Sequence, residues 1–153
     1  MKVEMVHLQV VKDNVVEYNP KKTITIPKIA ANWIRPIIGT ACREQILVCG
    51  MDASMKPTFI ETVAVGSTSE CYVSVAEVFK TALLTNSYGV MIFHNHPSGN
   101  CMPSKMDEYT TESIIKAAKL LNVKFLDHII VGDGDNYYSF MENRAVNACT
   151  KDE

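Results

Sequence analysis

The sequence lacks several features that would assign it to the membrane or to a secretory route. None of its 153 residues belongs to an apolar run long enough to cross a membrane, and Lys2, Glu4 and His7 interrupt the first ten residues, where a secretory signal would be continuously apolar. Its five cysteines include no Cys-x-x-Cys pair, and their odd number fits a reducing compartment better than a disulfide framework. We therefore expect a cytoplasmic protein that does not contact a membrane.

Excess positive charge is also missing. Fifteen lysines and arginines stand against 17 aspartates and glutamates, for a formal net charge of −2. Proteins that neutralise nucleic-acid phosphates usually carry a basic excess. The nearest approach to a basic cluster is Lys21-Lys22 with Lys28, which is typical of a solvated turn. The overall charge gives no support to a nucleic-acid partner, although a local basic patch is compatible with it.

Apolar residues are plentiful enough for one hydrophobic core. They make up 47% of the chain, and the sequence shows no internal repeat, low-complexity segment or linker. We predict a single domain over residues 1–153, with its main core in residues 40–142. Residues 1–40 are expected to form an extension of strands, including a hairpin around the turn at residues 12–14, and one short helix. That helix should begin at Pro27 and end before Pro36.

Within residues 40–142, strand-like and helix-like patterns alternate. The strands expected from β-branched and apolar runs are residues 46–49, 58–65, 89–93, 125–131 and 137–140. The helices expected are residues 75–86, capped by Ser74, and a second from about Ser104 that directs Ile114, Ala117, Ala118 and Leu121 toward the core. The last dozen residues are polar and are expected to be loose. This order predicts a mixed-sheet α/β sandwich with the sheet covered on at least one face.

Two histidines close the apolar run at residues 89–93. Side chains along a strand alternate between its faces, so His94 and His96 should point to the same side. The loop that follows is long enough to return Asp107 to them from the first turn of the next helix. Two imidazoles and one carboxylate leave a fourth tetrahedral position open for water, as in catalytic zinc sites.

An ordinary explanation competes with this interpretation. Ser104 and Asp107 also have the spacing of a capping box, in which the two residues only satisfy the start of the helix. Lone histidines are more often structural than metal-binding. We favour a metal site because ligands, turn formers and a helix start occur together. The combination is His94, His96, Pro97, Ser98, Gly99, Pro103, Ser104 and Asp107.

The string His94-Asn95-His96-Pro97-Ser98-Gly99, followed by Pro103-Ser104 and Asp107, resembles the JAMM motif of JAB/MPN-domain metalloproteases in its bacterial RadC form. The likeness extends to Arg43-Glu44, the helix at residues 75–86 and Asp127-His128 with the four residues after them, and so spans roughly residues 40–142. It implies an α/β/α sandwich similar to cytidine deaminase. It also implies Zn²⁺ held by His94, His96 and Asp107, with Glu44 as the acidic proton carrier and Ser104 as a hydrogen-bond donor in the transition state.

These implied roles agree with the chemistry of the side chains. A carboxylate beside zinc-activated water can take its proton and return it to a leaving amine, which suits Glu44. A hydroxyl near the metal can stabilise an oxyanion, which suits Ser104. From the sequence alone, Glu44 would more simply be a surface residue paired with Arg43 or Lys56, and Ser104 a helix cap.

Other residues near the motif have open roles. Asp127-His128 could orient groups beside the metal or simply end a strand. Cys101 lies in the metal loop, where an uninvolved thiol is the simpler interpretation. Substrate specificity is expected in loops such as residues 66–71 and 100–102, but their composition identifies no substrate.

The leading functional hypothesis is a zinc metallopeptidase-like hydrolase that cleaves a peptide or isopeptide bond in a peptide or protein substrate. The alternative is a DNA repair or recombination accessory protein, in which the metal is structural or acts on nucleic acid. RadC proteins usually carry a DNA-binding helix-hairpin-helix region ahead of this domain, whereas residues 1–40 are predicted to form strands and a short helix. Base deamination lacks support because the expected Pro-Cys-x-x-Cys ligands are missing.

Overall fold

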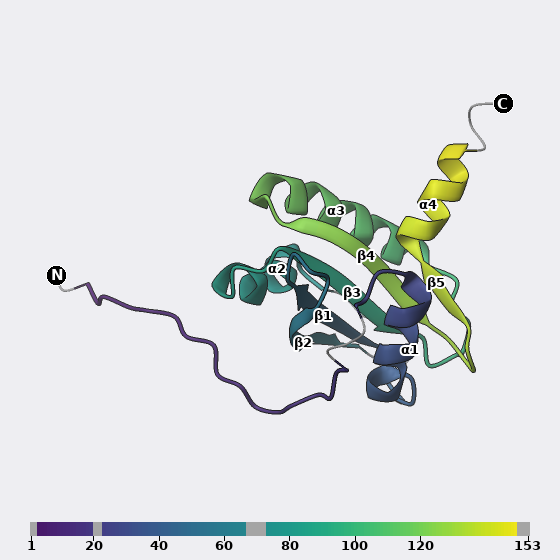
Figure 1. The fold of residues 1–153 in the computed structure, drawn as a ribbon, viewed down its shortest axis with the longest axis horizontal. Helices are drawn as coiled ribbons and strands as arrows, with labels where there is room; N and C mark the ends of the chain where they lie inside the picture. The colour runs from purple at the N-terminus through teal and green to yellow at the C-terminus, as the bar shows by residue number, and fades with distance from the viewer. Residues whose placement is uncertain (1–2, 20–22, 67–72, 150–153) are drawn as a thin grey trace.

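A five-stranded mixed sheet, with helices against both of its faces, forms the body of the protein (Figure 1). The computed structural model describes residues 3–19, 23–66 and 73–149, without the side chains of residues 145–149. The strands are β1 (Gln45–Met51), β2 (Pro57–Val65), β3 (Gly89–Asn95), β4 (Lys124–Val131) and β5 (Tyr137–Ser139). The helices are α1 (Pro27–Ile38), α2 (Val75–Leu84), α3 (Lys105–Leu121) and α4 (Phe140–Cys149). The predicted mixed-sheet α/β sandwich is confirmed.

The order of strands in the sheet is β2-β1-β3-β4-β5. β1 pairs antiparallel with β2 and β3, β4 pairs antiparallel with β5, and the central pair of β3 and β4 is parallel. Parallel neighbours need a crossover connection, which α3 supplies. This crossover brings the start of α3 to the carboxyl end of β3, where the two histidines lie.

Every residue of β3 is buried, as its continuously apolar sequence predicts for a strand covered on both faces. One face of the sheet packs on α1 through residues such as Ile34 and Phe93. The opposite face packs on α2 and α3 through residues such as Phe79 and Ile114. Leu121 was expected in this core, but 41% of it is exposed because the helix ends there and Asn122 turns the chain in a left-handed conformation.

The predicted N-terminal hairpin is wrong for the residues that the structure describes. Residues 3–19 and 23–26 contain no strand, and residues 3–16 extend away from the sheet with exposed side chains (Figure 1). A two-stranded hairpin is marginal in water unless its apolar face packs on another element. The first described contacts with the body are made at Trp33 of α1, whose indole nitrogen donates to the backbone oxygen of Glu17 at 3.4 Å and whose ring packs edge-on against Tyr18. Lys21 and Lys22 of the proposed basic cluster lie outside the described residues.

Two predicted helix boundaries also differ. α1 continues through Pro36 to Ile38 instead of ending before the proline. Burial of Ile34 and Ile38 holds the last turn together although Pro36 cannot donate a backbone hydrogen bond. The chain end, expected to be loose, forms α4 up to Cys149, and Phe140 belongs to this helix and not to the preceding strand.

None of the helices in the described ranges is long and apolar enough to span a membrane.

The packing of α1 predicts a test of the core. Ile34 is fully buried between α1 and the sheet, so Ile34→Ala should lower the free energy of unfolding by about 2–5 kcal/mol through lost burial and a residual cavity. Leu120→Ala is the matched control, because Leu120 is 88% exposed, and it should change stability by less than about 0.5 kcal/mol. Urea denaturation followed by circular dichroism measures both. Equal losses in the two variants would contradict this packing.

Candidate metal centre

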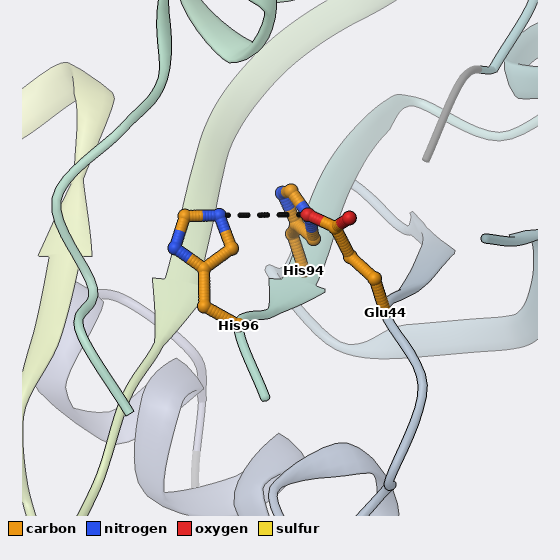
Figure 2. Close-up of side chains that lie close together, drawn as sticks. All are labelled: Glu44, His94 and His96. Carbon is orange, nitrogen blue, oxygen red and sulfur yellow. Dashed lines mark hydrogen bonds and ion pairs between the residues drawn. The ribbon is translucent and has the colours of Figure 1, made fainter. Parts of the chain in front are cut away.

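The carboxyl end of β3 carries the two histidines at the centre of the site. His94 is the penultimate residue of β3 and is fully buried, whereas His96 follows the strand and is partly exposed. Their rings meet edge to face with centroids 4.7 Å apart. The prediction that both side chains lie on one side of the strand end agrees with this geometry, shown in Figure 2.

Glu44 reaches the histidines from the neighbouring strand. The antiparallel register places Ile46 of β1 opposite His94, so Glu44, just before β1, comes beside the end of β3. Its Oε1 lies 2.5 Å from His94 Nε2 and 3.6 Å from His96 Nε2 (Figure 2). Glu44 is buried, so it is not the exposed surface residue that its sequence context alone favoured.

Asn95, between the two histidines, holds the segment that carries Glu44. Its side-chain oxygen accepts a hydrogen bond from the backbone nitrogen of Gln45 at 2.8 Å. Its amide group donates to the backbone oxygens of Ala41 and Arg43 at 3.3 and 3.1 Å. Asn95 was not among the predicted site residues. The available signal was a polar residue at the end of an otherwise apolar strand, whose side chain must point away from its histidine neighbours.

Asp107 arrives from the first turn of α3. Its Oδ1 lies 3.3 Å from His94 Nδ1 and its Oδ2 lies 3.5 Å from His96 Nε2. Asp107 also closes a capping box with Ser104, so the ordinary explanation of this pair holds as well. Both the backbone nitrogen and the hydroxyl of Ser104 donate to Oδ2 at 2.7 Å. Capping orients the carboxylate through one oxygen and leaves the other directed at His94.

A hydrogen bond in the loop after β3 determines which ring nitrogen of His96 carries the proton. The ring Nδ1 lies 2.7 Å from the backbone oxygen of Asn100, which can only accept, so Nδ1 carries the proton. The Nε2 lone pair, on the side of Glu44 and Asp107, is therefore free for a metal.

Two carboxylates beside a buried imidazole set its charge. Burial opposes protonation of His94, but hydrogen bonding and charge interactions with Asp107 and Glu44 outweigh it, so the pKa of His94 is raised above its usual value. Burial likewise favours the neutral form of Asp107, yet His94, His96 and Ser104 hold the pKa of that carboxyl well below its usual range. The site thus concentrates negative charge around two nitrogen ligands.

The residues present fit a divalent metal ion. Glu44, His94 and His96 each offer one ligand atom, and these atoms all lie within 4.8 Å of one another. The buried Nδ1 of His94 lies 3.3 Å from Asp107 Oδ1 but forms no hydrogen bond of good geometry in the described part of the chain, so the strongest interaction of this atom in the protein is with a carboxylate. Asp107 supplies a second carboxylate next to this group, so two acidic residues compete for the role of third ligand.

All five predicted site residues therefore meet in one place, while their individual roles stay predictions. Cys101 is partly exposed and does not belong to the group of Glu44, His94 and His96 that could hold a metal in the described part of the chain. Of the proposed specificity loops, residues 67–71 lie outside the described residues.

Comparisons with known proteins match most of the chain. The profile described as RadC-like JAB domain matches residues 24–145. Similar curated proteins include the UPF0758 protein of Methanosarcina mazei, 37% identical over 115 residues that are 75% of this chain and 50% of the relative. The UPF0758 protein of Haemophilus ducreyi is 36% identical over 123 residues, 80% of this chain and 55% of the relative. The chain spans about half the length of the curated relatives it matches.

The raised pKa of His94 predicts how the metal-free protein responds to pH. Between the unfolded-state value of about 6.5 and the higher folded-state pKa, the folded chain binds more protons than the unfolded chain. The stability due to protonated His94 should therefore be complete below about pH 6.5 and lost as the pH rises through the folded pKa. NMR titration of the His94 ring and urea denaturation, both with a chelator present, measure this.

Glu44→Gln removes one of the two carboxylates and should lower the pKa of His94 in the same titration. Glu77→Gln, on the exposed face of α2, should leave that pKa unchanged. A His94 pKa below the usual histidine value in the metal-free wild-type protein would contradict the charge arrangement.

Proposed function

The chain belongs to the RadC-like JAB-domain family, and from this premise we propose that it is a zinc-dependent hydrolase that cleaves a peptide or isopeptide bond. One observation carries the proposal. Two histidine nitrogens and two carboxylates converge at the end of a buried strand, with both Nε2 atoms near the same Glu44 oxygen. Such a nitrogen and oxygen donor set suits zinc with an open coordination position.

In this proposal His94, His96 and Asp107 hold the metal. The protonated Nδ1 of His96 leaves its Nε2 available, and the depressed pKa of Asp107 keeps its carboxylate ionised. The contacts of Asp107 with Ser104 orient the carboxylate before a metal arrives. When bound, zinc would polarise the scissile carbonyl and lower the pKa of a coordinated water toward neutrality.

Glu44 is the proposed proton carrier. Its carboxylate takes a proton from the attacking water and delivers it to the leaving amine as the carbon–nitrogen bond breaks, so Glu44 ends each cycle in its starting form. The hydrogen bonds of Asn95 to the backbone of Ala41, Arg43 and Gln45 support this role. They hold the backbone on either side of Glu44 in place while the carboxylate accepts and then donates the proton.

Ser104 is the proposed donor to the tetrahedral oxyanion. Its hydroxyl lies 2.7 Å from Asp107 Oδ2, next to a proposed ligand. A hydroxyl proton can rotate without displacement of its oxygen. The Ser104 hydroxyl can therefore donate to Asp107 before substrate binds and to the oxyanion during the reaction.

The substrate is proposed to be a peptide or protein. The proposed location of the protein is the cytoplasm. An amide bond is the proposed target because its leaving amine needs a proton, and the placement of Glu44 beside the histidines would let its carboxyl group supply one. The reducing compartment rests on the cysteine pattern of the sequence.

Metal analysis tests the ligand set. Protein purified without added metal should contain about one equivalent of zinc per chain, and Asp107→Ala should lose it. Glu77→Ala controls for loss of a carboxylate in the first turn of a helix and should retain zinc. If Glu44→Gln loses zinc while Asp107→Ala keeps it, Glu44 is the third ligand and the proposed division of roles is wrong.

Turnover tests the proton carrier. Glu44→Gln should retain zinc and lower kcat by about 10²–10⁴-fold, because general acid–base catalysis contributes a factor of that order. Fluorogenic peptides and isopeptide-linked lysine substrates provide the assay, with Glu77→Gln as the matched control. Turnover equal to the wild type in a zinc-loaded Glu44→Gln variant would remove Glu44 from the mechanism.

A further inference from the structure

We infer that His128 and Thr111 are positioning residues that hold His94 on β3 and Asp107 on α3 in a fixed relation to each other. The inference rests on the proposed metal site, and concerns two residues that neither bind the metal nor touch the substrate in that proposal. His128 lies on β4, beside β3, and Thr111 lies one turn after Asp107 on α3. Both are completely buried.

The donor and acceptor of each hydrogen bond that links His128, Thr111 and Asp107 can be assigned. Thr111 Oγ1 donates to the backbone oxygen of Asp107 at 2.6 Å, because a carbonyl can only accept. The hydroxyl has no second proton, so its 2.7 Å contact with His128 Nδ1 requires the histidine to donate. His128 is thereby linked through one side chain to the backbone of a proposed metal ligand.

The ring of His128 also contacts the other proposed ligand. It stacks on the ring of His94 with centroids 5.9 Å apart and an interplanar angle of 18°. The ring of His128 also stacks on Phe140, with centroids 4.8 Å apart and an angle of 11°. Contacts with two rings restrict the position of His128, and His94 is one of the residues that this restriction involves.

Asp127 explains why Phe140 is available for this stack. Its buried carboxylate accepts hydrogen bonds from the Ser139 hydroxyl at 2.6 Å and from the backbone nitrogen of Met141 at 3.0 Å. These two residues flank Phe140 and fix the start of α4 against β4. The same carboxylate accepts from the backbone nitrogen of His128 at 2.7 Å. The dipeptide Asp127-His128 thus supports the site from outside the ligand set.

The surroundings keep His128 neutral. Its Nε2 is buried and has no hydrogen-bond partner among the described residues, so a proton there would have no acceptor. A neutral ring with its proton on Nδ1 satisfies Thr111 and adds no positive charge beside the metal ligands.

Zinc affinity of paired threonine variants tests the inference. Thr111→Val keeps the shape of the side chain but removes the hydroxyl, and should weaken zinc binding about 10–100-fold, the usual effect of losing a group that orients a ligand. Thr111→Ser restores the hydroxyl and should bind zinc within about threefold of the wild type. Thr110→Val makes the same substitution at the adjacent residue, whose side chain has no hydrogen bond to the described part of the chain, and should match the wild type. Competition with a chromophoric chelator measures each Kd.

NMR of the metal-free protein provides a second readout that needs neither zinc nor turnover. Two-bond ¹H–¹⁵N spectra at pH 7 should show His128 as the neutral tautomer with its proton on Nδ1, and Thr111→Val should shift the ring resonances of His94. A proton on Nε2 of His128, or undisturbed His94 resonances in Thr111→Val, would overturn the inference.

The two readouts separate this inference from the proposed function. If the wild-type protein takes up no zinc, the proposed function fails, and the spectra still decide whether His128 and Thr111 position His94. If zinc binds and Thr111→Val holds it as tightly as the wild type, the positioning inference alone fails.

Discussion

Burial of β3 on both faces is the constraint on which the rest of the structure depends. A strand between two helical layers must be apolar along its length, and the first polar side chains it carries appear where it leaves the core. His94 is therefore fully buried, in surroundings where charge and hydrogen-bond interactions are strong and unpaired polar groups are costly. Neighbouring elements supply the hydrogen-bonding and charged groups that compensate for burying His94.

Three elements supply those groups from separate parts of the chain. The segment before β1 brings Glu44, held by Asn95, and the start of α3 brings Asp107, held by Ser104. β4 brings His128 against the other side of His94. The parallel pairing of β3 and β4 makes α3 a crossover, so its first turn necessarily returns to the edge of the sheet where β3 ends. The topology of the sheet thus determines which residues meet at the site.

Several side chains serve the fold and the site together. The capping box at Ser104 satisfies the start of α3 and also orients Asp107, so capping and metal binding are compatible functions of the same pair. Asn95 joins two strand ends and also fixes Glu44. Asp127 closes the junction of β5 and α4 and thereby sets Phe140 against His128. In each case the same hydrogen bonds stabilise the fold and orient a residue of the site or a residue that supports it.

The strands, the helices α2 and α3, and the motif from His94 to Asp107 could be predicted from sequence because each depends on local patterns. A short, continuously apolar run marks β3, and the spacing from His94 to Asp107 marks the motif. The hairpin before residue 20 failed as a prediction because a strand pattern forms a strand only where a partner exists, and local pattern carries no information on partners. Glu44 was identified through family resemblance, since 50 residues separate it from His94 and only the register of β1 on β3 joins them. The types and spacing of residues in the chain were enough to identify which side chains have the required chemistry. Their hydrogen-bond partners, their burial and the tautomers of His96 and His128 depend on distances between elements that are remote in the chain, so only the tertiary structure reveals them.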